Sequence, residues 1–95
     1  MRPKDLDPVH PGEVLAEDFL KPLDITQSRL AEHVGVTVQR VNEIINGRRG
    51  ISPETAWLLA QAFGTSPKFW LNLQNQYDLA TKRPKRRIRK LAAVR

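Results

Sequence analysis

The feature that most constrains the fold is the spacing of small and apolar residues between positions 27 and 44. Counted from Gln27, Ala31 lies four residues on and Gly35 eight residues on. The apolar positions at offsets three, nine, fourteen and seventeen are Leu30, Val36, Val41 and Ile44. Position 31 must be small because the next helix crosses close over it. Position 35 ends the first helix in the left-handed conformation, which is costly for any residue with a Cβ and therefore favours glycine. The spacing predicts two helices joined by a tight turn, the arrangement that sets a second helix against DNA, although a purely structural helical hairpin needs some of the same residues.

Capping residues locate this pair of helices and the helix before it. Thr26 and Thr37 are suited to be their N-caps, and the second helix, over about residues 37–46, should end at an Asn-Gly pair. An apolar stripe at three-to-four spacing predicts an earlier helix that begins near residue 12. Pro22 is expected to stop that earlier helix, because proline lacks the amide hydrogen that a helix interior needs.

Two further helices begin at Ser-Pro pairs, in which a polar cap precedes a proline in the first turn. They start at residues 52 and 66 and should end at Gly64 and near Thr81. No stretch alternates apolar and polar residues for long enough to predict a strand. The predicted fold is therefore all-α: an extended arm over residues 1–11, a five-helix domain over 12–81 and a short basic tail over 82–95 that is expected to be flexible.

Several function classes are excluded by what the chain does not contain. Its 95 residues suffice for one domain, whose core can draw on the large aromatic residues Phe19, Trp57, Phe63, Phe69 and Trp70. With no cysteine there is no disulfide or thiolate metal site, which suits a cytoplasmic protein, and no apolar run is long enough to predict a membrane span or a signal peptide. His10 and His33 lie far apart without ligand spacing, and no nucleophile or phosphate-loop motif occurs. We therefore expect no enzyme activity, metal or cofactor.

The charge is divided unevenly along the chain. The formal net charge is +6, yet residues 82–95 carry eight cations and no acid, which leaves the other residues at −2. A tail of this kind most often binds nucleic acid, with RNA, an acidic protein or a membrane surface as alternatives.

The exposed side of the predicted recognition helix carries groups that can read base edges. Gln39 and Asn42 have amides able to pair with adenine, Glu43 can accept from cytosine, and the Val38 methyl groups can contact thymine. Gln39 is the best aimed of these groups. Asn46 is more simply explained as a cap at the helix end.

Other residues are predicted to hold the DNA backbone. Gln27, at the start of the first helix of the motif, is placed to clamp a phosphate with nearby amides. Arg40 lies to one side of the recognition helix, and the following loop carries two more cations. The predicted backbone-contacting residues, together with the cap of the recognition helix, are Gln27, Thr37, Arg40, Arg48 and Arg49.

Motifs on both sides of this core carry a family resemblance. They are residues 10–15 (HPGEVL), 42–51 (NEIINGRRGI) and 65–74 (TSPKFWLNLQ). The central spacing resembles the Xre class of lambda-repressor-like helix-turn-helix proteins, and the flanking motifs resemble the HigA, or VapI-like, antitoxin family. The resemblance covers roughly residues 10–80. It implies a dimeric repressor of its own operon that also neutralises a RelE-like, ribosome-dependent mRNA-cleaving toxin. The basic tail departs from the family pattern.

Two partner surfaces follow. The last predicted helix has an apolar stripe with Trp70 and Tyr77, and Leu71 and Leu79 lie partly off that stripe. The helix is therefore more apolar than one buried face requires, which predicts a homodimer through this helix. The resemblance implies a basic toxin, so the candidate toxin surface is the arm and the acidic first helix. A stand-alone repressor without a toxin, and an RNA-binding or scaffolding protein acting through its tail, remain alternatives.

Overall fold

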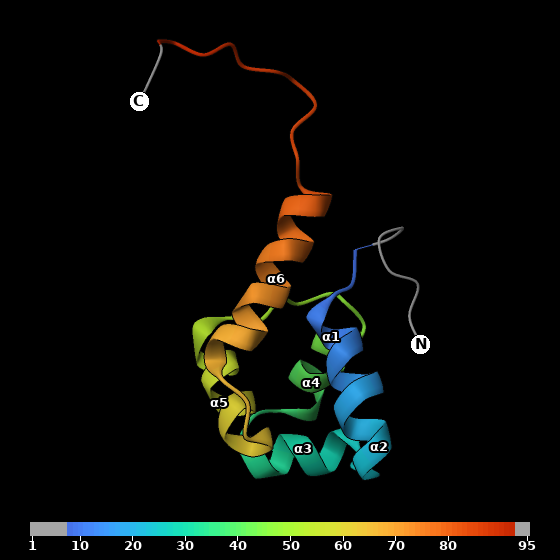
Figure 1. The fold of residues 1–95 in the computed structure, drawn as a ribbon. Coiled ribbons are helices and arrows are strands. Elements are labelled where there is room, and N and C mark those ends of the chain that lie inside the picture. Colours follow the sequence, from blue (N-terminus) through green and yellow to red (C-terminus); the bar gives the residue numbers. More distant parts are fainter. Residues whose placement is uncertain (1–7, 93–95) are drawn as a thin grey trace.

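The computed structural model describes residues 8–92, and every regular element in that range is a helix (Figure 1). α1 (Pro11–Val14), the π-helical turn η1 (Leu15–Leu20) and α2 (Lys21–Leu23) follow one another directly and form one continuous helix. The remaining helices are α3 (Gln27–Val34), α4 (Val38–Ile45), α5 (Pro53–Phe63) and α6 (Pro67–Thr81). The predicted all-α architecture of five helices is confirmed.

The first helix begins one residue earlier than its prediction. Pro11 is already helical rather than part of the predicted arm, and residues 1–7 of that arm lie outside the described residues. His10 caps this helix, because its Nδ1 accepts a hydrogen bond from the Gly12 N–H at 2.9 Å. The interpretation of His10 as a helix-entry side chain is therefore confirmed.

The prediction that Pro22 stops this helix is wrong. The helix continues through the proline and ends before Asp24, which adopts the left-handed conformation with φ of 57°. The turn that precedes the proline is π-helical, and the Lys21 N–H bonds to the Ala16 carbonyl five residues back. A wider turn relieves the clash between the proline ring and the carbonyl four residues back that a regular α-helix would impose.

The predicted caps of the other helices are confirmed. A threonine or serine hydroxyl accepts a backbone N–H at the start of each helix from α3 to α6; these N-caps are Thr26, Thr37, Ser52 and Ser66. Gly35 and Gly64 end α3 and α5 with φ of 81° and 72°. α6 ends at Thr81, as its spacing predicts.

The core lies where the first helix, α3, α4, α5 and α6 meet. Trp70 is fully buried, and Phe19 packs against it and against Phe63 with ring centroids 5.2 and 5.0 Å apart. Trp57, counted above as a core residue, is instead 59% exposed, because α5 turns a different face, built on Ala56 and Ala60, toward the core.

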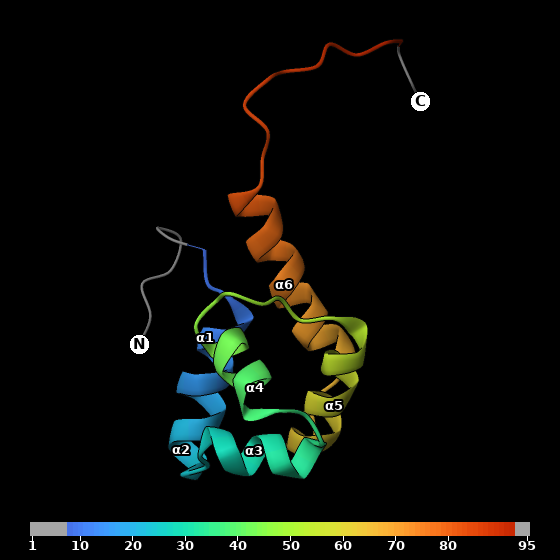
Figure 2. The same cartoon turned by 180° about the vertical axis from the view of Figure 1, so that it is seen from behind.

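Residues 82–92 continue beyond α6 without forming a helix, and all of them are exposed. They run away from the helical body (Figures 1 and 2). No helix in the described range 8–92 is long and apolar enough to cross a bilayer.

Candidate nucleic-acid interface

One face of α4 packs against the other helices, and the opposite face is exposed to solvent. Val41 and Ile44 are each 3% exposed. Gly12 of the first helix lies so close to the end of α4 that a Cβ there would overlap the Ile44 carbonyl oxygen. In Figure 2, α4 lies in front of α1, with α3 and α5 beside it. The outward residues Val38, Gln39 and Asn42 are exposed.

An amide ladder joins the two helices of the motif. The Asn42 Nδ2 donates to Gln27 Oε1 at 3.2 Å, and the Asn46 Nδ2 donates to Asn42 Oδ1 at 3.1 Å. Gln27 begins α3, so this ladder brings the predicted phosphate clamp beside a predicted base-reading residue. Each amide keeps other donor or acceptor positions for a ligand.

A second cluster gathers three further predicted residues. Glu43 accepts from the Gln39 Nε2 at 3.3 Å and from the Arg49 guanidinium at 3.0 Å. The sequence placed Glu43 on a cytosine and Arg49 on a phosphate, whereas the folded chain pairs them with each other. The arginine offsets the carboxylate charge, which would otherwise repel a phosphate backbone.

Arg40 lies to one side of α4, where its side chain contacts the start of α5. Its guanidinium donates to Thr55 Oγ1 at 2.7 Å and lies 3.4 Å from Glu54 Oε1, both at the start of α5. Its Nε is buried and has no partner among the described residues. The start of α5 passes the side of α4, so these contacts of Arg40 link α4 to α5.

The two remaining predicted residues lie at the ends of α4. Thr37 is its N-cap, with its Oγ1 accepting from the Arg40 N–H at 3.1 Å. Arg48 is exposed in the following loop, where its own N–H bonds to the Glu43 carbonyl at 2.8 Å.

The loop after α4 is held by α6 through residues that the sequence analysis missed. Gln74 Oε1 accepts from the Ile51 N–H at 2.7 Å, and its Nε2 donates to Asp78 Oδ1 at 3.0 Å. Asp78 also accepts from Lys82 at 2.8 Å, and these hydrogen bonds from Lys82 and Gln74 lower the pKa of its carboxyl group. The spacing of Gln74 and Asp78, four residues apart and so on the same side of α6, was the available signal. These hydrogen bonds connect Lys82, the first residue of the basic tail, to the loop that follows the recognition helix.

His10 lies beside this network. Its ring contacts Tyr77 edge to face, with centroids 4.8 Å apart. Partial burial lowers the pKa of His10, the nearby Asp78 charge opposes that shift, and Lys82 reinforces it. No group of three His, Cys, Asp or Glu side chains suited to a metal ion occurs within residues 8–92.

Comparison with known proteins identifies the family. A family model described as helix-turn-helix (HTH_3) matches residues 17–70, which include both helices of the motif. The Vibrio cholerae antitoxin HigA-1 is 44% identical over 79 residues, which span 83% of this chain and 74% of that protein. The chain belongs to the HigA (VapI-like) antitoxin family.

Two other members agree with this assignment. Virulence-associated protein I of Dichelobacter nodosus is 41% identical over 79% of this chain and 69% of its own length. The Pseudomonas aeruginosa antitoxin HigA, solved with the higBA promoter, is 45% identical with a TM-score of 0.77, over 79% of this chain and 82% of that one. The resemblance inferred from the sequence motifs is therefore confirmed, and HigA-family members are DNA-binding helix-turn-helix regulators.

Proposed function

We propose that the protein is the sequence-specific DNA-binding antitoxin of a type II toxin–antitoxin system, which represses its own operon and neutralises a RelE-like mRNA-cleaving toxin. The observation that carries the DNA-binding half is the exposed amide face of α4, on a helix fixed by Gly12 and Arg40. The Pseudomonas relative solved with a promoter supports the same reading. A cytoplasmic location would follow from an operator DNA target.

In this proposal the outward residues of α4 read bases in the major groove. Gln39 and Asn42 pair with adenine edges, and Val38, which is 48% exposed, contacts a thymine methyl group. Glu43 can accept a hydrogen bond from a cytosine amino group only if it first gives up the hydrogen bond from the Gln39 amide. The Gln39–Glu43 hydrogen bond, 3.3 Å long, is a weak one to give up.

The DNA backbone is held from both ends of the motif. Gln27 and the start of α3 clamp one phosphate, and Arg48 contacts another from the loop after α4, with Thr37 at the first turn between them. Arg49 joins them when it releases Glu43. Arg40 positions α4 relative to α5 through its hydrogen bond to Thr55.

The active form is a two-fold symmetric dimer on an inverted repeat, with two recognition helices about 34 Å apart. Leu79 on α6 is 78% exposed, which supports an interface through that helix. Leu71 is half-buried against the core and contributes less to such a surface.

The toxin binds away from α4, so that the complex can still occupy DNA. The acidic residues Glu13, Glu17 and Asp18 of the first helix are exposed and suit a basic partner. Reversing Glu17 and Asp18 to lysine should weaken toxin binding and leave operator binding intact. Retained toxin binding in this variant would move the interface elsewhere.

The experiment that tests the whole proposal is co-purification with the product of the neighbouring gene, followed by a gel shift on the chain's own promoter. A shift without any co-purified toxin would favour the stand-alone repressor. Binding to RNA that survives substitution of Gln39 but not removal of the exposed tail would favour the RNA-binding alternative.

A further inference from the structure

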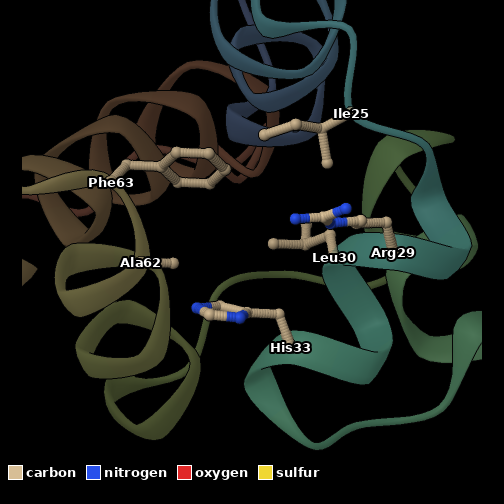
Figure 3. Close-up of a pocket in the computed structure, with 6 residues that line it drawn as sticks. All are labelled: Ile25, Arg29, Leu30, His33, Ala62 and Phe63. Carbon is tan, nitrogen blue, oxygen red and sulfur yellow. The ribbon is translucent and has the colours of Figure 1, made fainter.

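A small pocket opens between α3 and the C-terminal part of α5 (Figure 3). It encloses about 130 Å³, and its lining residues are Ile25, Arg29, Leu30, His33, Ala62 and Phe63. Arg29 and His33 extend from α3 toward α5, and the Phe63 ring extends back toward Ile25 (Figure 3). The two helices therefore meet around a space that their own side chains leave open.

The side-chain polar groups at this pocket have no partner among the described residues. Neither the Arg29 guanidinium nor the His33 imidazole forms a hydrogen bond or ion pair with any residue in the range 8–92. None of the six lining residues is acidic. An unpaired guanidinium and an imidazole N–H beside an apolar hollow are complementary to a carboxylate attached to an apolar body.

The apolar part of the pocket sets the size of that body. Leu30 forms part of the floor and is 3% exposed, and Phe63 forms a wall. An engineered apolar cavity of about 150 Å³ in another protein binds benzene. A pocket of about 130 Å³ that opens to solvent accommodates one ring, with the charged group left at the rim beside Arg29.

We infer that this pocket binds a small monocarboxylate that carries a single aromatic ring or a branched chain of similar size. The occupant bridges α3, the first helix of the helix-turn-helix, to the aromatic cluster, since Phe63 packs on Phe19 with centroids 5.0 Å apart. A ligand that binds only the folded chain raises its thermal stability by mass action. The inference does not depend on which DNA or toxin the protein recognises.

Benzoate is the probe for the test, titrated into the isotope-labelled full chain and followed by NMR. Saturable shifts are expected at the amides of Arg29, Leu30, His33 and Ala62, with a Kd on the order of 1 mM for so small a ligand. Benzyl alcohol, which has the ring without the charge, should bind at least about fivefold more weakly, because it lacks the charge-assisted contact. Acetate, which has the charge without the ring, should give no saturable shifts at these amides.

Two variants separate the pocket from general attraction to a basic protein. Arg29→Gln should weaken benzoate binding about five- to tenfold, whereas Arg83→Gln in the exposed tail should leave it unchanged. Ala62→Leu should fill the hollow and abolish binding without lowering Tm. Benzoate shifts confined to the tail, binding that survives Ala62→Leu, or no binding of benzoate at all would each overturn the inference.

Discussion

At the exposed face of α4, the Gln39 amide is the group best aimed at a base edge. We predict that Gln39→Ala costs about 1–3 kcal/mol on the cognate operator and relaxes the sequence preference, because a bidentate base contact is lost. Binding to random DNA should hardly change. Gel shifts on operator and scrambled duplexes at one salt concentration measure both effects.

Arg48→Ala is the matched control for this prediction. A phosphate contact carries no sequence information, so its loss should weaken operator and scrambled DNA by the same factor. If Gln39→Ala also lost equal affinity on both duplexes, the base-reading role would be abandoned.

His10 makes the stability of the fold depend on pH. Burial lowers the pKa of His10 in the folded chain, so the unfolded chain takes up the proton more readily. The stability that neutral His10 contributes is therefore complete above its unfolded pKa of about 6.5 and is lost as pH falls through the lower folded pKa. Protonated Nδ1 can no longer accept the Gly12 N–H, which removes the cap of the first helix.

The measurement is the urea midpoint at about pH 8 and about pH 5.5 for the native chain and for His10→Asn. Asparagine keeps a capping oxygen but does not titrate, so this variant should lose less stability on acidification. Equal acid losses in the two proteins would show that His10 is not the titrating group.

Among the helices, the decisive contact is the approach of the first helix to the end of α4. Gly12→Ala would drive a Cβ into the Ile44 carbonyl, and because neither backbone can move alone, we expect a loss of at least about 3 kcal/mol of unfolding free energy. Gly35→Ala, where no atom lies within 4 Å of the new Cβ, should cost only about 1 kcal/mol from its left-handed φ. Similar losses in urea titrations of the two variants would contradict the direct contact.

Features that depend on adjacent residues could be predicted from the sequence, whereas features that depend on distant contacts could not. Caps such as Thr26 and the left-handed Gly35 depend on a few adjacent residues, so the boundaries of α3 to α6 were predictable. The direction of Arg40 was not, because Thr55 approaches it from fifteen residues away. The exposure of Trp57 likewise depends on which face α5 turns toward the other helices.

For the whole molecule, α6 is the proposed dimer helix. Leu79 is 78% exposed, so Leu79→Glu should weaken association with little loss of stability. Leu71→Glu should instead destabilise the monomer, since Leu71 packs against the core. Sedimentation equilibrium with thermal unfolding distinguishes the two, and an undisturbed dimer in Leu79→Glu would exclude this part of α6 from the interface.

The basic tail acts at the scale of the whole complex. With the rest of the chain at a formal −2, long-range attraction to DNA must come mainly from the eight cations of residues 82–95. Each phosphate that a cation neutralises contributes roughly 0.9 to the slope of log affinity against log salt concentration. If half of the tail cations engage, deleting residues 82–95 should flatten this slope by several units per dimer.

The operator preference should survive that deletion, because base reading lies on α4. The test is a salt titration of the full-length and truncated proteins on one operator, with scrambled DNA as the specificity control. A tail with two of its arginines replaced by glutamine should give an intermediate slope if the charges act independently. Superimposable slopes for the full-length and truncated proteins would show that the tail does not touch DNA. Its cations would then be available to the toxin, to RNA or to solvent, and the attraction for the operator would have to come from the few cations around α4.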